Sequence, residues 1–94
     1  MAETAEARIK RMKMRSMRRG IKEMDLILGG FADRELEGLN EADLLIYDAL
    51  LSENDHDLYQ WISGQKPTPP EYLELMTRIA ASQSTAVSHG SRPV

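Results

Sequence analysis

Apolar residues recur at the three- and four-residue spacing of an α-helix in five separate segments, and no stretch alternates apolar and polar residues as a strand would. The first two segments run from about Thr4 to Met17 and from about Arg19 to Glu37. The third begins at Asn40, the fourth ends before Gly64, and the fifth ends at about Ala81. Because glycines or capping residues separate these segments, the sequence predicts an all-α protein, a small five-helix bundle in a single domain.

Several helix starts are marked by residues whose side-chain oxygens can accept hydrogen bonds from the first turn of backbone N–H groups. Thr4 stands before the first segment, Asn40 before the third, and either Asn54 or Asp55 before the fourth. The stretch Thr68-Pro69-Pro70-Glu71 has the spacing of a capping box, with proline at the first helical position. These signals predict where four of the five helices begin.

Glycines and a change in composition mark the predicted interruptions. Gly29-Gly30 lies inside the second apolar pattern, and two adjacent glycines predict a kink there, or a helix that ends and restarts. From Ser82 onward, serine, glutamine, glycine and proline replace the periodic pattern. We therefore expect a helical domain over residues 1–82 and a disordered tail over residues 83–94.

The sequence offers no set of residues that would carry catalysis. It contains no cysteine, which excludes disulfides, thiolate metal sites and thiol nucleophiles. Asp55-His56-Asp57 combines two carboxylates with an imidazole, but consecutive helical residues point in different directions, and acids are favoured in a first turn by the helix dipole. Trp61 has apolar neighbours at helical spacing, which indicates a core anchor. We expect no metal site and no enzymatic activity.

Charge is unevenly distributed along the chain. The net charge is −3, yet Arg8 to Lys22 holds eight cationic residues and no acid, so the remainder carries −11. Such polarity favours docking onto a charged partner. An alternative is a nucleic-acid-binding or antitoxin-like regulator that uses the basic first helix. The sequence pI of 5.3 and the lack of aromatic residues within the basic run count against nucleic acid.

The basic run meets its first acid at Arg18-Arg19-Gly20-Ile21-Lys22-Glu23. If this stretch is helical, Arg19 and Glu23 share a face. Glycine within a helix costs about 1 kcal/mol relative to alanine, so Gly20 needs a reason. Either it is a helix junction, or it leaves a flat spot where another backbone approaches closely.

This stretch resembles the Arg-Gly-x-x-Glu signature of the succinate dehydrogenase flavinylation factors, the family of the bacterial SdhE and mitochondrial assembly factor 2 proteins. The resemblance covers about Arg8 to Ala81 and includes Asp57-Leu58-Tyr59-Gln60-Trp61, which is similar to that family's Asp-Leu-aromatic-x-Trp. It implies a five-helix chaperone that binds the flavoprotein subunit of succinate dehydrogenase, and in some members fumarate reductase. Such a factor promotes covalent attachment of FAD to its partner and holds no cofactor tightly itself.

The same resemblance implies which residues would form the partner-binding surface. They are Arg18, Arg19, Gly20, Lys22, Glu23 and Asp25. Arginines suit such a surface because their guanidinium groups pair bidentately with carboxylates. We expect a monomer when free, with no nucleic-acid partner.

The location of the protein is predicted from what its N-terminal region lacks. No apolar run approaches the roughly 20 residues that span a bilayer, and the start lacks the apolar core of a secretory signal. Glu3 and Glu6 are atypical of a mitochondrial presequence. We expect a cytoplasmic protein if the source is bacterial, a mitochondrial matrix protein if it is eukaryotic, and no membrane insertion.

Overall fold

The computed structural model describes residues 3–91, with side chains described up to Gln83, and helices joined by turns and loops are its only regular secondary structure over that range. The elements are α1 (Ala5–Arg15), α2 (Lys22–Glu35), a 3-10 turn η1 (Leu36–Gly38), α3 (Glu41–Leu50), α4 (Asp55–Ile62) and α5 (Pro70–Ser91). The prediction of an all-α bundle of five helices is therefore confirmed.

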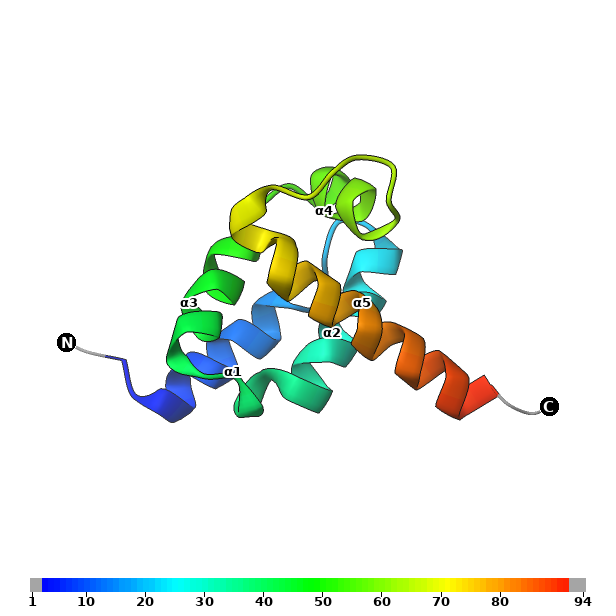
Figure 1. Ribbon diagram of the computed structural model, residues 1–94. Coiled ribbons are helices and arrows are strands. Elements are labelled where there is room, and N and C mark those ends of the chain that lie inside the picture. The colour runs from blue at the N-terminus through cyan, green and yellow to red at the C-terminus, as the bar shows by residue number, and fades with distance from the viewer. Residues whose placement is uncertain (1–2, 92–94) are drawn as a thin grey trace.

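Helix α5 crosses the front of the molecule and packs against α2, α3 and α4, and its C-terminal part extends away from the bundle (Figure 1). Helix α1 packs against α2 and η1. The chain between α1 and α2 rises towards α4 at the top of the view, which brings residues far apart in sequence side by side (Figure 1).

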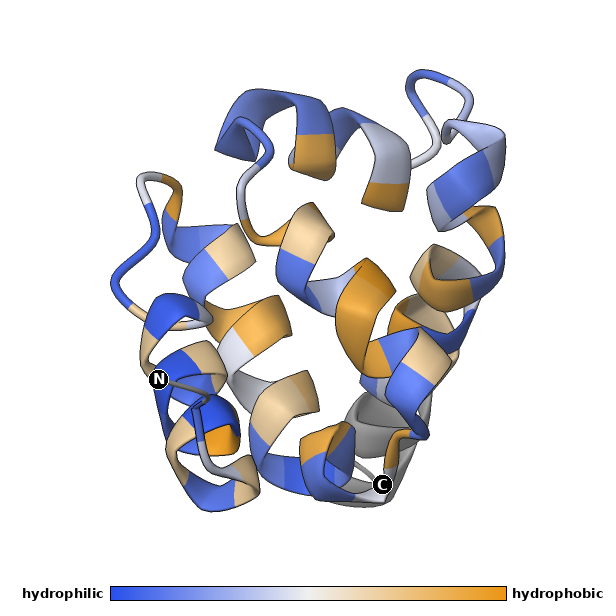
Figure 2. Ribbon diagram, turned by 90° about the vertical axis from the view of Figure 1, so that its left-hand side faces the viewer, coloured by the Kyte–Doolittle hydropathy of each residue, from blue (hydrophilic) through white to orange (hydrophobic). Residues whose placement is uncertain are grey.

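The core is formed by the apolar faces of all five helices, and hydrophobic segments gather towards the middle of the bundle (Figure 2). The rings of Phe31 and Tyr47 lie 5.5 Å apart at its centre. Trp61 is half-buried against the core, and its ring lies 5.8 Å from that of Tyr72. The expected role of Trp61 as a packing residue is confirmed.

Side-chain caps begin three helices as their local sequences predict. Thr4 accepts a hydrogen bond from the Ala7 N–H at the start of α1, and Asn40 accepts one at the start of α3. Asn54, rather than Asp55, caps α4. Gly64 follows α4 with φ of 83°, in the left-handed region that favours glycine.

Two predicted interruptions are wrong. Helix α2 runs unbroken through Gly29-Gly30, because the residues on either side, Leu28 and Phe31, are buried and hold this part of the helix against the core. The fifth helix does not end near Ala81, since the backbone stays helical to Ser91. No proline occurs between Pro70 and Pro93, so an established helix can add residues at little cost. Residues 92–94 of the predicted tail lie outside the described residues.

Among the described residues, no helix is both long enough and apolar enough to cross a lipid bilayer.

Candidate functional site

The segment between α1 and α2 is an ordered loop rather than a helix. Arg18 has φ of 56°, in the left-handed region that is rare for residues other than glycine. Its backbone N–H donates to Oδ1 of Asp25 at 2.8 Å, so a residue in the first turn of α2 stabilises the unusual backbone. The prediction that Arg19 and Glu23 share one helical face is wrong, because α2 begins only at Lys22.

Asp55, the first residue of α4, fastens this loop to the rest of the protein. Its Oδ1 accepts a hydrogen bond of 2.8 Å from Nε of Arg19, and its Oδ2 accepts one of 2.7 Å from the backbone N–H of Gly20. The Arg19 and Asp55 side chains are only 10% and 19% exposed. Charge-assisted hydrogen bonds shielded from water are strong, so this arrangement fixes the loop.

The remaining donors of Arg19 also point into the protein. Its Nη1 donates to the carbonyl oxygens of Arg15 at 2.9 Å and Leu51 at 3.0 Å. These carbonyls lie at the C-terminal ends of α1 and α3, where a cation is favoured by both helix dipoles. Arg19 is therefore occupied within the protein, and it shapes the loop rather than projecting towards a partner.

Gly20 is exposed, and the side chain that would crowd a larger residue at this position is that of Asp55. A Cβ atom at this position would lie 3.2 Å from Oδ2 of Asp55. The interpretation of Gly20 as a helix junction is thus confirmed, whereas the close approach of another backbone stays a prediction.

The structure brings the six predicted site residues together, in two roles. Arg19, Gly20 and Asp25 make the hydrogen bonds that hold the loop. The others, Arg18, Lys22 and Glu23, have exposed side chains.

Sequence reasoning missed the role of Asp55, which it explained only as an acidic residue in a first helical turn. No local pattern pairs it with Arg19, because the two are 36 positions apart. A usable signal would have been the need of a buried arginine for a carboxylate.

A second buried polar contact, between Ser16 and Tyr47, lies where the loop leaves α1. The two hydroxyl oxygens are 2.6 Å apart, and both residues are fully buried. The Ser16 hydroxyl also lies 2.8 Å from the Met12 carbonyl, and the Tyr47 hydroxyl lies 3.5 Å from the Leu28 carbonyl, so each hydroxyl has a backbone acceptor besides the other hydroxyl. Burial raises the pKa of Tyr47 to about 12, so the phenol stays protonated.

Much of the positive charge on α1 is neutralised inside the fold. Arg11 and Arg15 both bind Asp48 of α3 at 3.0 Å, and Arg8 binds Glu41 at 2.9 Å. The hydrogen bond from Arg11 lowers the pKa of Asp48. These cations are therefore engaged with carboxylates, which weakens the interpretation of α1 as a phosphate-binding helix.

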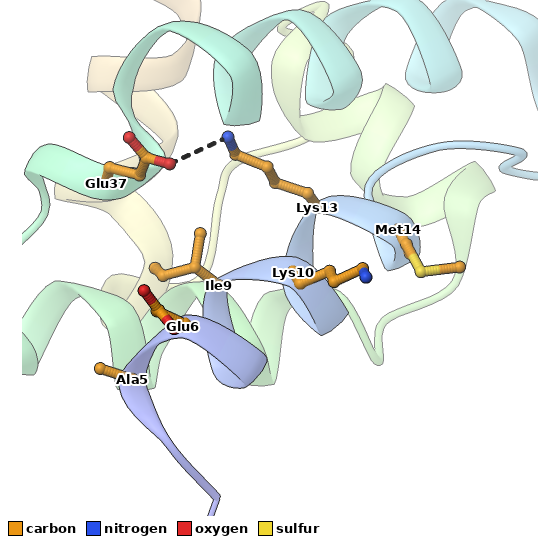
Figure 3. Close-up of a pocket in the computed structure, with 7 residues that line it drawn as sticks. All are labelled: Ala5, Glu6, Ile9, Lys10, Lys13, Met14 and Glu37. Atoms are coloured by element: carbon orange, nitrogen blue, oxygen red, sulfur yellow. Dashed lines mark hydrogen bonds and ion pairs between the residues drawn. The ribbon is translucent and has the colours of Figure 1, made fainter.

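An open groove of about 470 Å³ lies between α1 and Glu37 of η1 (Figure 3). Lys13 crosses one edge of it to pair with Glu37 at 3.3 Å, and Ile9 and Met14 supply apolar lining. The lining contains no nucleophile paired with a base, and no group of three potential metal ligands occurs in the described part of the chain. The ordered loop is consequently the stronger candidate site.

Comparison with known proteins identifies the family. Residues 10–83 match the protein family described as flavinator of succinate dehydrogenase. This chain belongs to that family. The match spans the candidate loop and Asp55, so the residues of the flavinator signature and the residue that anchors them fall in the same domain.

Curated relatives agree with the flavinator family. Three proteins named succinate dehydrogenase assembly factor 2, mitochondrial, are similar to this chain. The one from Drosophila grimshawi is 43% identical over 67 residues, covering 69% of this chain and 46% of that protein. The one from Mycosarcoma maydis is 38% identical over 93 residues, covering 99% of this chain and 36% of that protein. The Candida glabrata protein is 40% identical over 68 residues, covering 72% of this chain and 44% of that protein. The chain thus spans less than half the length of these relatives.

Proposed function

We propose that this protein is an assembly factor that binds the flavoprotein subunit of succinate dehydrogenase and promotes covalent attachment of FAD to it. The family match over residues 10–83 carries the proposal. A fumarate reductase flavoprotein is a second client of the same kind. The comparisons give no support to a nucleic-acid-binding or antitoxin-like regulator.

In this proposal the protein acts as a chaperone and not as an enzyme. It binds its partner as a monomer and holds it in a geometry in which the partner's own residue reacts with FAD, which is catalysis by positioning. FAD belongs to the partner, and the factor holds no cofactor tightly. The relatives are mitochondrial by name. We place this chain in the mitochondrial matrix if its source is eukaryotic and in the cytoplasm if it is bacterial.

We propose different roles for the signature residues, and the loop geometry supports this division. Arg19 and Gly20 build the surface through Asp55, whereas the exposed Arg18, Lys22 and Glu23 contact the partner. Removing one partner of a charge pair that is buried at an interface commonly costs about 2–5 kcal/mol, so we expect these three residues to matter for binding rather than for folding.

The test is to incubate the flavin-free flavoprotein subunit with FAD, with and without this protein. Covalent flavin is then measured by fluorescence on a denaturing gel. We expect faster attachment with the factor and no redox activity from the factor alone. Equal rates with and without it, at concentrations where the two proteins bind, would refute the proposal.

Two variants separate direct contact from a general effect of charge. Glu23→Ala should slow attachment by about tenfold or more, because its exposed carboxylate is expected to be buried against the partner, while stability should fall by less than about 1 kcal/mol, the contribution of a first-turn acid. Glu71→Ala is the matched control, since Glu71 is likewise exposed and is likewise the second residue of its helix. The control should leave the rate unchanged.

A further inference from the structure

Two apolar side chains are exposed beside the flavinator signature. Leu26 is 65% exposed on α2, and Met17 is 42% exposed in the loop. A Cβ atom on Gly29 would lie 3.7 Å from Cγ of Met17, so Met17 rests on α2 at Gly29. Gly29 is three residues after Leu26, which puts it on the same side of the helix. We call Met17, Leu26 and Gly29 the Met17–Leu26 face.

This face is not explained by the packing of the core. The inward side of α2 is formed by Met24, Leu28 and Phe31, all fully buried, and Leu26 lies outside that row. Single exposed leucines are common on protein surfaces. Leu26 differs in lying one helical turn from Gly29, against which the exposed side chain of Met17 packs.

The Met17–Leu26 face is continuous with the charged residues assigned to partner contact. Leu26 follows Lys22 by four residues and Glu23 by three, so these side chains lie one helical turn away on the same side. Arg18 directly follows Met17 in the loop. An apolar centre beside exposed charges is the usual composition of a protein-binding site, where a few central side chains contribute most of the affinity.

We propose that the Met17–Leu26 face is the apolar centre of the surface that binds the flavoprotein subunit. Leu26 and Met17 enter an apolar depression on the partner, while Arg18 and Lys22 pair with carboxylates at its rim. Gly29, which lacks a side chain, lets Met17 lie close against α2 and so fixes the position of Met17 on this face. This inference rests on the proposed function. It adds which residues contribute most of the affinity for the flavoprotein.

The experiment measures the affinity of the purified flavoprotein subunit for the wild-type protein, Leu26→Gln, Met17→Gln and Leu45→Gln. Leu45 is the matched control because it is 58% exposed, on α3. We expect Leu26→Gln to weaken binding about tenfold or more, as expected for a central interface residue, and Met17→Gln to weaken it less. Leu45→Gln should remain within about twofold of wild type, and thermal unfolding should show all variants folded.

The outcomes separate this inference from the proposed function. Failure of the wild-type protein to bind the flavoprotein would refute the proposed function. Tight wild-type binding with unchanged affinity of Leu26→Gln and Met17→Gln would refute the Met17–Leu26 face alone. Analytical sedimentation tests whether the face instead binds a second copy of this chain. The inference is wrong if the wild type forms dimers and Leu26→Gln dissociates them without changing the affinity for the flavoprotein.

Discussion

The carboxylate of Asp55 pairs with the guanidinium of Arg19 at 2.8 Å, between residues 36 positions apart in the chain. The same carboxylate accepts the backbone N–H of Gly20 at 2.7 Å. The conformation of the α1–α2 loop therefore depends on the start of α4. Two residues of the family signature owe their arrangement to a residue outside it.

Replacing Asp55 by alanine should lower the free energy of unfolding by about 2–4 kcal/mol, because the largely buried guanidinium of Arg19 loses its counter-charge. Asp57→Ala is the control, since Asp57 is an exposed acid in the same helical turn, and it should cost less than about 1 kcal/mol. Urea denaturation measures both values. Equal losses in the two variants would show that the Arg19–Asp55 pair does not stabilise the loop.

Gly20→Ala should destabilise the protein through Asp55. The added Cβ would lie 3.2 Å from Oδ2, so the carboxylate has to shift, at a cost of about 0.5–1 kcal/mol. In the Asp55→Ala background that cost should disappear, because the crowding atom is gone. A double-mutant cycle by urea denaturation gives the coupling energy. A coupling of zero would mean that the two positions act independently.

Gly29→Ala should raise the free energy of unfolding by about 0.5–1 kcal/mol, because alanine favours the helix and its Cβ would make only ordinary contacts, at 3.7 Å or more. Gly30→Ala should raise the free energy of unfolding by less, since its Cβ would lie 2.9 Å from Nη1 of Arg34 and the arginine side chain would have to move. Thermal unfolding compares the two. A destabilised Gly29→Ala would show that Met17 and the Ser16 carbonyl leave too little room for a Cβ at this position.

Stability should fall at alkaline pH because the pKa of Tyr47 is raised to about 12 in the folded protein. An unfolded tyrosine titrates near pH 10, so the unfolded state loses its proton first. The stabilisation is complete below about pH 10 and is lost as the pH rises towards 12. Tyr47→Phe should cost about 1 kcal/mol at pH 7 and reduce the alkaline slope, because the residue no longer ionises. Urea denaturation from pH 7 to 11.5 tests this.

The slope should not vanish in Tyr47→Phe. Burial and a 2.7 Å hydrogen bond to Glu53 also raise the pKa of Tyr72 to about 12. An alkaline slope identical in wild type and Tyr47→Phe would show that Tyr47 makes no contribution.

Features set by neighbouring residues were predictable from the sequence. Thr4, Asn40 and Asn54 cap helices because the oxygen and the N–H it accepts lie two or three residues apart. The length of α2 was not predictable, since the burial of Leu28 and Phe31 outweighs the local preference of two glycines.

The position of the candidate loop in the chain was predictable, but its geometry and its anchor Asp55 were not. The signature stretch located the loop, yet helical spacing misplaced Arg19, because nothing local reveals that Arg18 turns the chain at φ of 56°. The inward direction of Arg19 depends on Asp55 and on carbonyls of two other helices. Such contacts exist only once the helices are packed.

The contact between Trp61 and Tyr72 allows tryptophan fluorescence to report on the position of α4. Trp61 is the only tryptophan and lies near the end of α4, the helix that begins with Asp55. Its ring lies tilted against that of Tyr72, whose hydroxyl donates to Glu53, and the Glu53 carbonyl accepts a hydrogen bond from Arg19. Displacement of α4 changes the exposure of the indole to solvent and shifts its emission wavelength. Intrinsic fluorescence can therefore follow whether Asp55 stays bound to the α1–α2 loop, without any attached dye.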